Sequence, residues 1–309
     1  MAGTPGAAGH DAPEPTNLTI EGVQVVGTHN SYHQAPAIAF DASHAFTHKP
    51  LDQQLAGGVR ALELDLHLGS NGTFEVYHIS LIDQGASCLT LGDCLGVVAT
   101  WSASNPRHAP VFIWFEVKDD TGGGAIDDLV PIEDAILEAF ERERIMTPAW
   151  LRGTHPSPRA RLMATGWPTL DEARGMVLFA LIDRDARTKA YSHDGTSLDD
   201  RVMWVNAAPA EFDQPWAAIT KVEEQGMQAV IAQAHTAHLL IAANSCAINM
   251  TDDACTARFR ELADAGVHML HDDLPFQIPG RNYWTRLPGG ASPACNPVTA
   301  QTGCAAPLE

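Results

Sequence analysis

The chain has 309 residues, 45% of them hydrophobic, so it can bury one large core or two ordinary ones. Its 38 acidic residues outnumber its 19 basic residues, which gives a formal net charge of -19. This balance argues against a nucleic-acid partner and against simple electrostatic docking on an anionic membrane, because both require a surplus of lysine and arginine.

The first sixteen residues, MAGTPGAAGHDAPEPT, are rich in glycine, alanine and proline, and we expect a flexible lead-in there. Residues 17–309 are predicted to form a single domain, because no long linker interrupts them. No apolar stretch approaches the roughly 20 residues that a membrane span needs. The lead-in also lacks the apolar run of an export signal.

Eight apolar, β-rich segments follow one another along the chain. They are Val23–Gly27, Val59–Leu68, Phe74–Ile79, Val111–Val117, Met176–Ile182, Val202–Asn206, Leu239–Ala243 and Val267–Leu270. The helical patterns between them are Pro50–Ala56, Ile126–Arg144, Trp216–Ala234 and Asp252–Ala265. Continuous apolar strands that alternate with helices indicate a parallel sheet covered on both faces. The chain is therefore predicted to be an α/β protein, a single-domain (β/α)₈ TIM barrel with disulfide-clipped loops.

The last predicted helix has recognisable ends. Thr251 stands before an acidic first turn, where its hydroxyl can cap free backbone N–H groups. Gly266 sits where a residue of left-handed conformation would end the helix. The segment from residue 288 to residue 309 is rich in proline, glycine and small residues, and we expect an irregular tail.

Six cysteines occur as three pairs of near neighbours along the chain. The simplest pairing joins Cys88 to Cys94, Cys246 to Cys255 and Cys295 to Cys304. It is one of 15 possible connectivities, chosen by proximity alone. An even number in close pairs favours an oxidising compartment, so we expect a secreted or periplasmic protein whose export signal has been removed. Free buried cysteines in a cytosolic protein are the alternative.

Carboxylates are concentrated near the ends of the second and fourth predicted strands. Glu63 and Asp65 are two residues apart, as are Glu116 and Lys118, so each pair shares one face of its strand. If that face is the barrel lumen, three carboxylates converge and need a cation, because buried like charges repel. Together with the Asn30 amide they form a set of oxygen ligands that suits Ca²⁺. The set suits Mg²⁺ less well, because Mg²⁺ keeps several water ligands.

Two histidines also follow predicted strands, and the carboxyl ends of barrel strands form the active face. His29 precedes Asn30 after the first strand, and His78 ends the third. The ordered set of His-Asn, Glu-x-Asp, His and Glu-x-Lys lies between residues 23 and 118. This set resembles the phosphoinositide-specific phospholipase C superfamily, specifically its bacterial Ca²⁺-dependent branch. The later HDDLP motif, from His271 to Pro275, also resembles this superfamily.

The resemblance implies a Ca²⁺ site beside a phosphate held between two imidazoles. The implied ion ligands are Asn30, Glu63, Asp65 and Glu116. Ca²⁺ would lower the pKa of an inositol hydroxyl, and Glu63, or in its place Glu116, would act as base for attack on phosphorus. His29 would stabilise the phosphoryl oxygens, and a protonated His78 would donate to the departing diacylglycerol oxygen. The implied products are diacylglycerol and a cyclic inositol phosphate.

Further residues are expected at the edge of the site. Lys118 would direct a point charge toward the phosphate. Arg184 and Asp272 follow later apolar strands, and we expect them to contact the inositol headgroup. The expected partner is a phospholipid or glycerophosphoinositol substrate, with transient contact to a membrane surface and no nucleic acid. We expect the protein to act as a monomer.

Two other functions fit parts of the pattern. A glycerophosphodiester phosphodiesterase or a sphingomyelinase-D-like enzyme shares the barrel, the two histidines and the Glu-x-Asp pair. The former usually shows His-Arg where this chain has His29-Asn30. The other is a non-catalytic lipid- or carbohydrate-binding barrel, which would have no physical need for both His29 and His78. The sequence therefore favours cleavage of phosphatidylinositol.

Overall fold

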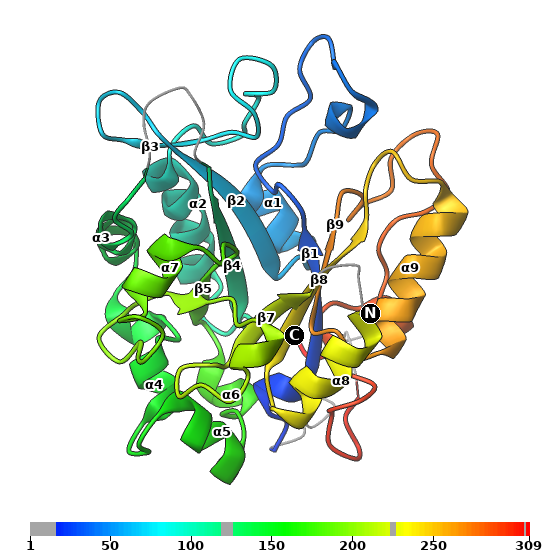
Figure 1. Ribbon diagram of the computed structural model, residues 1–309. Helices are drawn as coiled ribbons and strands as arrows, with labels where there is room; N and C mark the ends of the chain where they lie inside the picture. The colour runs from blue at the N-terminus through cyan, green and yellow to red at the C-terminus, as the bar shows by residue number, and fades with distance from the viewer. Residues whose placement is uncertain (1–16, 119–125, 223–226, 306) are drawn as a thin grey trace, which may run out of the picture.

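A computed structural model describes residues 17–118, 126–222, 227–305 and 307–309, so the expected lead-in lies outside the described residues. Eight parallel strands form the central sheet (Figure 1). They are β1 (Val23–Thr28), β2 (Ala61–Leu68), β4 (Val111–Val117), β5 (Val177–Leu181), β6 (Trp204–Val205), β7 (Ile219–Val222), β8 (Leu240–Cys246) and β9 (Met269–Asp272). Their spatial order is β6-β5-β4-β2-β1-β9-β8-β7, which is that of a nearly closed barrel. The predicted TIM-like fold is confirmed.

The barrel has a seam between β6 and β7, where the described residues form no strand ladder. Bonds at the strand ends bridge it instead. The Ala207 amide donates to the Ile219 carbonyl over 3.1 Å, and the Asn206 side-chain oxygen accepts from the Lys221 amide over 2.8 Å. The side-chain oxygen of Asn206 therefore replaces a backbone carbonyl as the acceptor at this seam.

Two of the predicted elements were assigned wrongly. The third predicted strand, β3 (Phe74–Val76), pairs antiparallel with β2 and extends it as a hairpin outside the parallel set. The predicted helix Trp216–Ala234 is wrong in its first half, where the chain forms β7, and only its second half belongs to α8 (Met227–Thr236). β7 has only four residues and a lysine among them, so it lacks the long apolar run by which the other strands are recognised.

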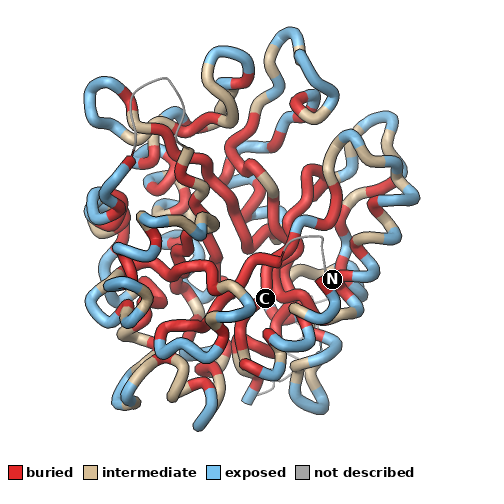
Figure 2. Tube along the Cα trace, viewed as in Figure 1, coloured by how far each residue is buried: buried red, intermediate tan, exposed pale blue. Residues whose placement is uncertain are grey.

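Helices surround the strands on the outside, and the buried chain in the middle is the sheet (Figures 1 and 2). Besides α8 they are α1 (Leu51–Ala56), α2 (Leu91–Ser104), α3 (Val130–Ala139), α4 (Pro148–Arg152), α5 (Pro158–Thr165), α6 (Leu170–Ala173), α7 (Ala186–Tyr191) and α9 (Asp252–Asp264). Short 3₁₀ helices occur at Ile20–Gly22, Ala42–His44, Arg142–Arg144, Pro209–Glu211 and Pro288–Gly290. Strand side chains such as Leu62, Trp114 and Phe179 are fully buried. Their burial supplies much of the hydrophobic stabilisation.

The ends of α9 follow the prediction. The Thr251 hydroxyl accepts from the Ala254 amide over 3.2 Å, which caps the helix. Gly266 has a φ of 78° just after the helix, a conformation that favours glycine. A methyl group at this glycine would lie 2.7 Å from the Val298 side chain, so the close approach of the tail also requires the glycine.

All three predicted disulfides are present, Cys88–Cys94, Cys246–Cys255 and Cys295–Cys304. The tail is anchored by β10 (Ala294–Cys295), which pairs antiparallel with the first residues of β1, Val23 and Gln24. It therefore packs at the amino end of the barrel and leaves the carboxyl ends of the strands accessible. Among the described residues, no helix combines the length and apolar character that crossing a bilayer requires.

Candidate active site

Three carboxylates carried by β2 and β4 meet on one side of the sheet. Glu63 and Asp65 share one face of β2, and Asp65 lies directly beside Glu116 in the β2–β4 register. An oxygen from each of the three lies within 4.8 Å of the others. The alternation of side-chain directions along the strands therefore brings the three carboxylates together, as predicted from their two-residue spacing.

Asp65 is the most informative member of this cluster. It is fully buried, and neither of its carboxylate oxygens has a hydrogen-bond partner of good geometry among the described residues. Burial, together with the charges of Glu116 and Glu63, raises the pKa of Asp65 to about 7 although Lys118 opposes this shift. A fully buried carboxylate beside two further carboxylates fits a hard cation such as Ca²⁺.

Two lysines neutralise the cluster. Lys118 Nζ lies 2.6 Å from Glu116 and 3.2 Å from Asp65, so the predicted phosphate-binding lysine is engaged with carboxylates. Lys221 Nζ lies 2.6 Å from Glu63 Oε2. Lys221 was missed because β7 was predicted as helix; the isolated lysine between β-branched residues was the available signal. Burial alone would raise the pKa of Glu63, but Lys221 and His29 outweigh it and hold that pKa well below its usual value.

His29 is held between two carboxylates. Its Nδ1 lies 2.8 Å from Asp273 Oδ1 and its Nε2 lies 3.8 Å from Glu63 Oε1. The Ile248 amide donates to the other oxygen of Asp273 and fixes that carboxylate. Burial lowers the pKa of His29, but the charges of Glu63 and Asp273 outweigh burial and raise it to about 9. His29 is therefore a cation at neutral pH.

His78 follows β3 and lies on a loop instead of at the end of a barrel strand. Its Nδ1 lies 2.8 Å from Asp83 Oδ2, in a loop held by paired backbone bonds between Ile79 and Asp83. Burial lowers the pKa of His78 although Asp83 opposes this shift, and the positive charges of Lys118 and His29 lower it further. The orientation of His78 is therefore set by its loop and by Asp83.

Asn30 is buried in the turn after β1, with a φ of 46° that asparagine tolerates better than most residues. Its Oδ1 accepts from the Tyr32 hydroxyl over 3.4 Å. The next residue, Ser31, donates its amide to the Glu63 carbonyl over 2.9 Å. This bond holds the turn against β2 and keeps Asn30 close to the carboxylate cluster.

A cavity opens over part of this cluster. Its lining is His29, Glu63, Glu116, Ile182, Asp183, Arg184, Asn206, Lys221, Val222, Asn244 and Arg258. Of the predicted site residues, Asn30, Asp65, His78, Lys118 and Asp272 are outside this lining, as far as the described residues define it. Asp183 follows a predicted strand and Asn206 ends one, whereas Asn244 and Arg258 were not predicted as site residues.

The two predicted headgroup residues differ in position. Arg184 lines the cavity, and its guanidinium donates to the Asn206 side chain and to the Lys221 carbonyl, both over 2.8 Å. Asp272 is buried behind the cavity, where it accepts from Tyr283, Ser245 and the backbone. The structure therefore assigns Asp272 a place in the framework, and the prediction that it contacts the substrate has no support in this arrangement.

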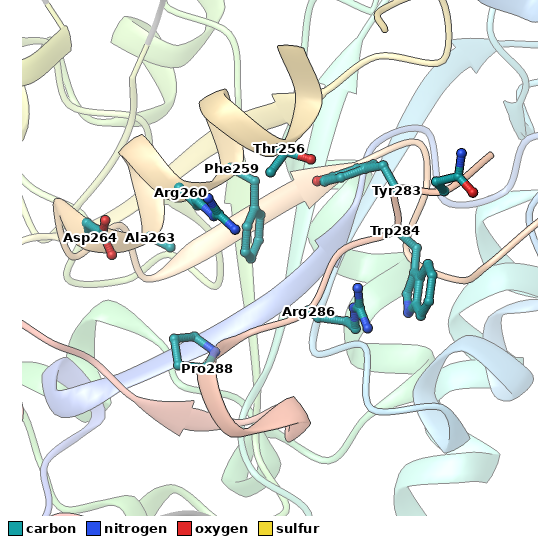
Figure 3. A pocket seen from close by; sticks show the side chains of 10 residues that line it. Thr256, Phe259, Arg260, Ala263, Asp264, Tyr283, Trp284, Arg286 and Pro288 are labelled. Carbon is teal, nitrogen blue, oxygen red and sulfur yellow. The ribbon is translucent and has the colours of Figure 1, made fainter. Parts of the chain in front are cut away.

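A second cavity lies between α9 and the segment 282–288. Phe259, Arg260, Tyr283, Trp284 and Arg286 are among its lining residues (Figure 3). The Arg286 guanidinium packs over the Trp284 ring at 3.8 Å. Glu63, Glu116 and Lys221 line the other cavity, so we place the candidate site there, beside the carboxylate cluster.

A parallel barrel that carries a carboxylate cluster and two lysines, with two carboxylate-bound imidazoles on the loops beside them, defines a catalytic face of the metal-dependent phosphodiesterase type. The family model for Ca²⁺-dependent phosphoinositide phospholipase C matches residues 18–74 and 67–297 of this chain. The chain belongs to this enzyme family, which confirms the resemblance seen in the sequence.

Individual relatives agree with the family. The chain is 26% identical over 183 residues to PI-PLC X domain-containing protein 1 of Arthroderma benhamiae, an alignment that covers 59% of this chain and 52% of that protein. The chain thus spans about half the length of that relative. Two bacterial Ca²⁺-dependent enzymes share the fold. The Pseudomonas sp. structure has a TM-score of 0.62 at 16% identity and covers 85% of this chain and 92% of its own. The Streptomyces antibioticus structure has a TM-score of 0.61 at 20% identity, with coverages of 82% and 94%.

Proposed function

We propose that this protein is a Ca²⁺-dependent phosphatidylinositol phosphodiesterase of the phospholipase C type. It cleaves the lipid by attack of an inositol hydroxyl on phosphorus and releases diacylglycerol and a cyclic inositol phosphate. The observation that supports this most strongly is the convergence of Glu63, Asp65 and Glu116, with Asp65 fully buried, next to the cationic His29.

The proposed ion ligands are Asn30, Glu63, Asp65 and Glu116. A Ca²⁺ ion held there would lower the pKa of an inositol hydroxyl and so favour its attack on phosphorus. The donor set contains only oxygen atoms, which fits Ca²⁺ better than a transition metal. Glu63, whose pKa is far below its usual value, is a weak base. Glu116 is more accessible and faces the cavity, so we assign it the proton-accepting role in place of Glu63.

The two imidazoles divide the remaining work. His29 carries a positive charge held by Asp273, and it stabilises negative charge on the phosphoryl oxygens. Asp83 accepts from Nδ1 of His78 and favours the protonated ring against the effect of burial, so that Nε2 of the imidazolium gives a proton to the departing diacylglycerol oxygen. Arg184 and Lys221 line the cavity and favour an anionic headgroup.

One assay tests the proposal against its rivals. The protein is incubated with phosphatidylinositol, glycerophosphoinositol and glycerophosphocholine, with Ca²⁺ or with chelator, and the phosphorus-containing products are identified. We expect cyclic inositol phosphate in the presence of Ca²⁺ and none in chelator. Release of choline or glycerol phosphate would support a glycerophosphodiesterase. An absence of turnover with all three substrates would support a binding barrel.

Replacing His78 with alanine is expected to lower turnover by a factor of ~10² to 10⁴, because the leaving oxygen would lose its proton donor. The matched control is His193→Ala, which removes an exposed histidine that also pairs with an aspartate, Asp200, at 2.8 Å. Turnover of both variants is measured at saturating Ca²⁺. An unchanged rate for His78→Ala would remove this residue from the mechanism.

Ca²⁺ affinity is expected to depend on pH through Asp65. Because the pKa of Asp65 is about 7, below that pH the carboxyl must release a proton before it can bind the ion. The affinity should therefore fall by up to about tenfold per pH unit below pH 7 and level off above it. Calorimetric titration with Ca²⁺ between pH 5 and pH 8.5 measures this dependence. A flat profile would contradict the assignment of Asp65 as a ligand.

We also propose that two loops beside the site touch the lipid surface. Ile38, Phe40 and Leu81 expose 77%, 74% and 88% of their surface, on loops beyond the carboxyl ends of the strands (Figure 1). Replacing all three with serine should lower turnover of vesicle-bound phosphatidylinositol several-fold and leave a short-chain monomeric analogue unaffected. The control Met163→Ser alters an exposed apolar residue on α5. Equal losses on both substrates would contradict lipid contact.

The three disulfides are consistent with an oxidising, extracytoplasmic compartment. We propose that the protein acts as a secreted or periplasmic enzyme on phospholipid or on glycerophosphoinositol.

A further inference from the structure

Three histidines gather around one buried aspartate on the loops next to the candidate site. His33 Nε2 lies 2.9 and 3.0 Å from the two oxygens of Asp83, and His78 Nδ1 lies 2.8 Å from Oδ2. His44 Nδ1 lies 3.8 Å from the same Oδ2. One ligand atom each from His33, His78 and Asp83 all lie within 4.8 Å of one another.

His44 provides a second, independent observation. Its side chain is only 8% exposed, and its Nδ1 has no hydrogen-bond partner within the described ranges of the chain. This nitrogen is directed at Asp83, yet it is too far away to bond to it. Leaving a buried polar atom unpaired is unfavourable, so its orientation toward a carboxylate and two other imidazoles points to a shared ligand.

The surroundings prepare these rings to bind a metal. His33 Nδ1 lies 2.9 Å from the Phe46 carbonyl, which can only accept, so Nδ1 donates there and Nε2 is the nitrogen directed at Asp83, where a metal ion would replace the hydrogen on Nε2. The His44 and His78 rings meet edge to face at 5.2 Å. Asp83 is fixed by its backbone pairing with Ile79. The donor atoms are therefore held close together by loops that are already bonded.

We propose that His33 Nε2, His44 Nδ1, His78 Nδ1 and Asp83 form a site for Zn²⁺ or a similar transition-metal ion, separate from the carboxylate cluster. Three imidazole nitrogens and one carboxylate oxygen form a four-coordinate set that zinc prefers and that Ca²⁺ does not. The site joins the loop that carries Ile38 and Phe40 to the loop that carries Leu81. Binding therefore fastens the two loops together.

Occupation of this site controls His78. A metal ion on Nδ1 takes the position that faces Asp83 and leaves the ring with a hydrogen on Nε2 only. A metal-bound imidazole is a far weaker acid than an imidazolium ion, so His78 no longer protonates the departing oxygen. Zinc therefore inhibits turnover without displacing Ca²⁺. This consequence rests on the proposed function, whereas the binding of the metal does not.

The test uses the whole protein with saturating Ca²⁺, so that the carboxylate cluster is filled. Co²⁺ is titrated in, and the intense visible absorption of four-coordinate Co²⁺ is recorded, followed by its loss when Zn²⁺ is added. We expect one such site per chain. His44→Ala should weaken binding at least ~10-fold, and His193→Ala should not change it. Absence of the four-coordinate spectrum, or an unaltered spectrum in His44→Ala, would overturn the site.

Turnover of phosphatidylinositol is then measured against Zn²⁺ concentration. We expect wild-type turnover to be inhibited and restored by a zinc-selective chelator. His44→Ala should keep its basal turnover and require at least ~10-fold more Zn²⁺ for inhibition. Metal binding without inhibition would overturn the link to His78. If the protein has no turnover at all, the proposed function fails, while the Co²⁺ spectrum still decides whether the metal site exists.

Discussion

Replacing Asp65 with asparagine is expected to reduce turnover by at least ~10³-fold while leaving the Ca²⁺-free protein no less stable than the wild type. Metal activation of a hydroxyl contributes several kcal/mol to catalysis, and this substitution removes a charged ligand of the ion. Most substitutions of buried charged residues destabilise, because they break a bonded network. Asp65 differs, since its oxygens have no hydrogen-bond partner of good geometry among the described residues. In the variant, Lys118 would still have its ion pair with Glu116.

The sign of the stability change depends on pH. The folded-state pKa of Asp65 is raised from 3.8 to about 7, so ionising this group in the fold costs free energy once the pH exceeds 3.8. That cost grows until pH 7 and is then constant. The free energy of unfolding of Asp65→Asn should therefore exceed that of the wild type at pH 8 by about 1 to 3 kcal/mol, and the difference should vanish near pH 4.

Urea denaturation in chelator at both pH values measures this difference, and product analysis measures turnover. Asp213→Asn is the control, because the Asp213 side chain is 96% exposed and lies outside the site. A clear loss of stability for Asp65→Asn at pH 8, or turnover at the wild-type rate, would contradict the role assigned to Asp65.

Replacing Lys221 with methionine is expected to destabilise the Ca²⁺-free protein by about 2 to 4 kcal/mol, and Ca²⁺ should recover most of this loss. Lys221 is the closest cation to Glu63, and both side chains are almost fully buried. Removing it leaves a buried carboxylate whose remaining ion-pair partners, among the described residues, are His29 and His271. A bound cation supplies the missing positive charge, so the affinity for Ca²⁺ should also rise.

The measurement is urea denaturation with chelator and with saturating Ca²⁺. Lys189→Met, on the surface helix α7, is the control and should show no Ca²⁺-dependent difference. If Lys221→Met is equally destabilised with and without Ca²⁺, then Lys221 and the ion do not share Glu63 as a partner.

Much of the site could be predicted because it depends on strand periodicity. Two-residue spacing places Glu63 and Asp65 on one face, and parallel register brings Glu116 alongside Asp65. Lys221 was missed because a four-residue strand carries too little pattern to be distinguished from the start of a helix. Asp83 was missed for another reason, since its contact with His78 depends on a loop conformation that no periodicity encodes.

Asp272 illustrates a different limit of the sequence pattern. It ends a barrel strand, but its carboxylate accepts from Tyr283 and Ser245 and is not part of the lining of the cavity. A strand end brings a residue to the correct edge of the barrel, whereas its side-chain direction depends on the position of its neighbours. Its neighbour Asp273 contacts His29 instead.

The seam between β6 and β7 has an evolutionary consequence. Main-chain ladders persist through almost any substitution, but the bonds that Asn206 and Arg184 make across the seam disappear with a single codon change. Both residues also line the cavity. Within the described barrel, substitutions at these two positions can therefore change the diameter of the cavity entrance while every strand ladder stays intact. We expect homologues that accept bulkier polar headgroups to differ first at Asn206 and Arg184.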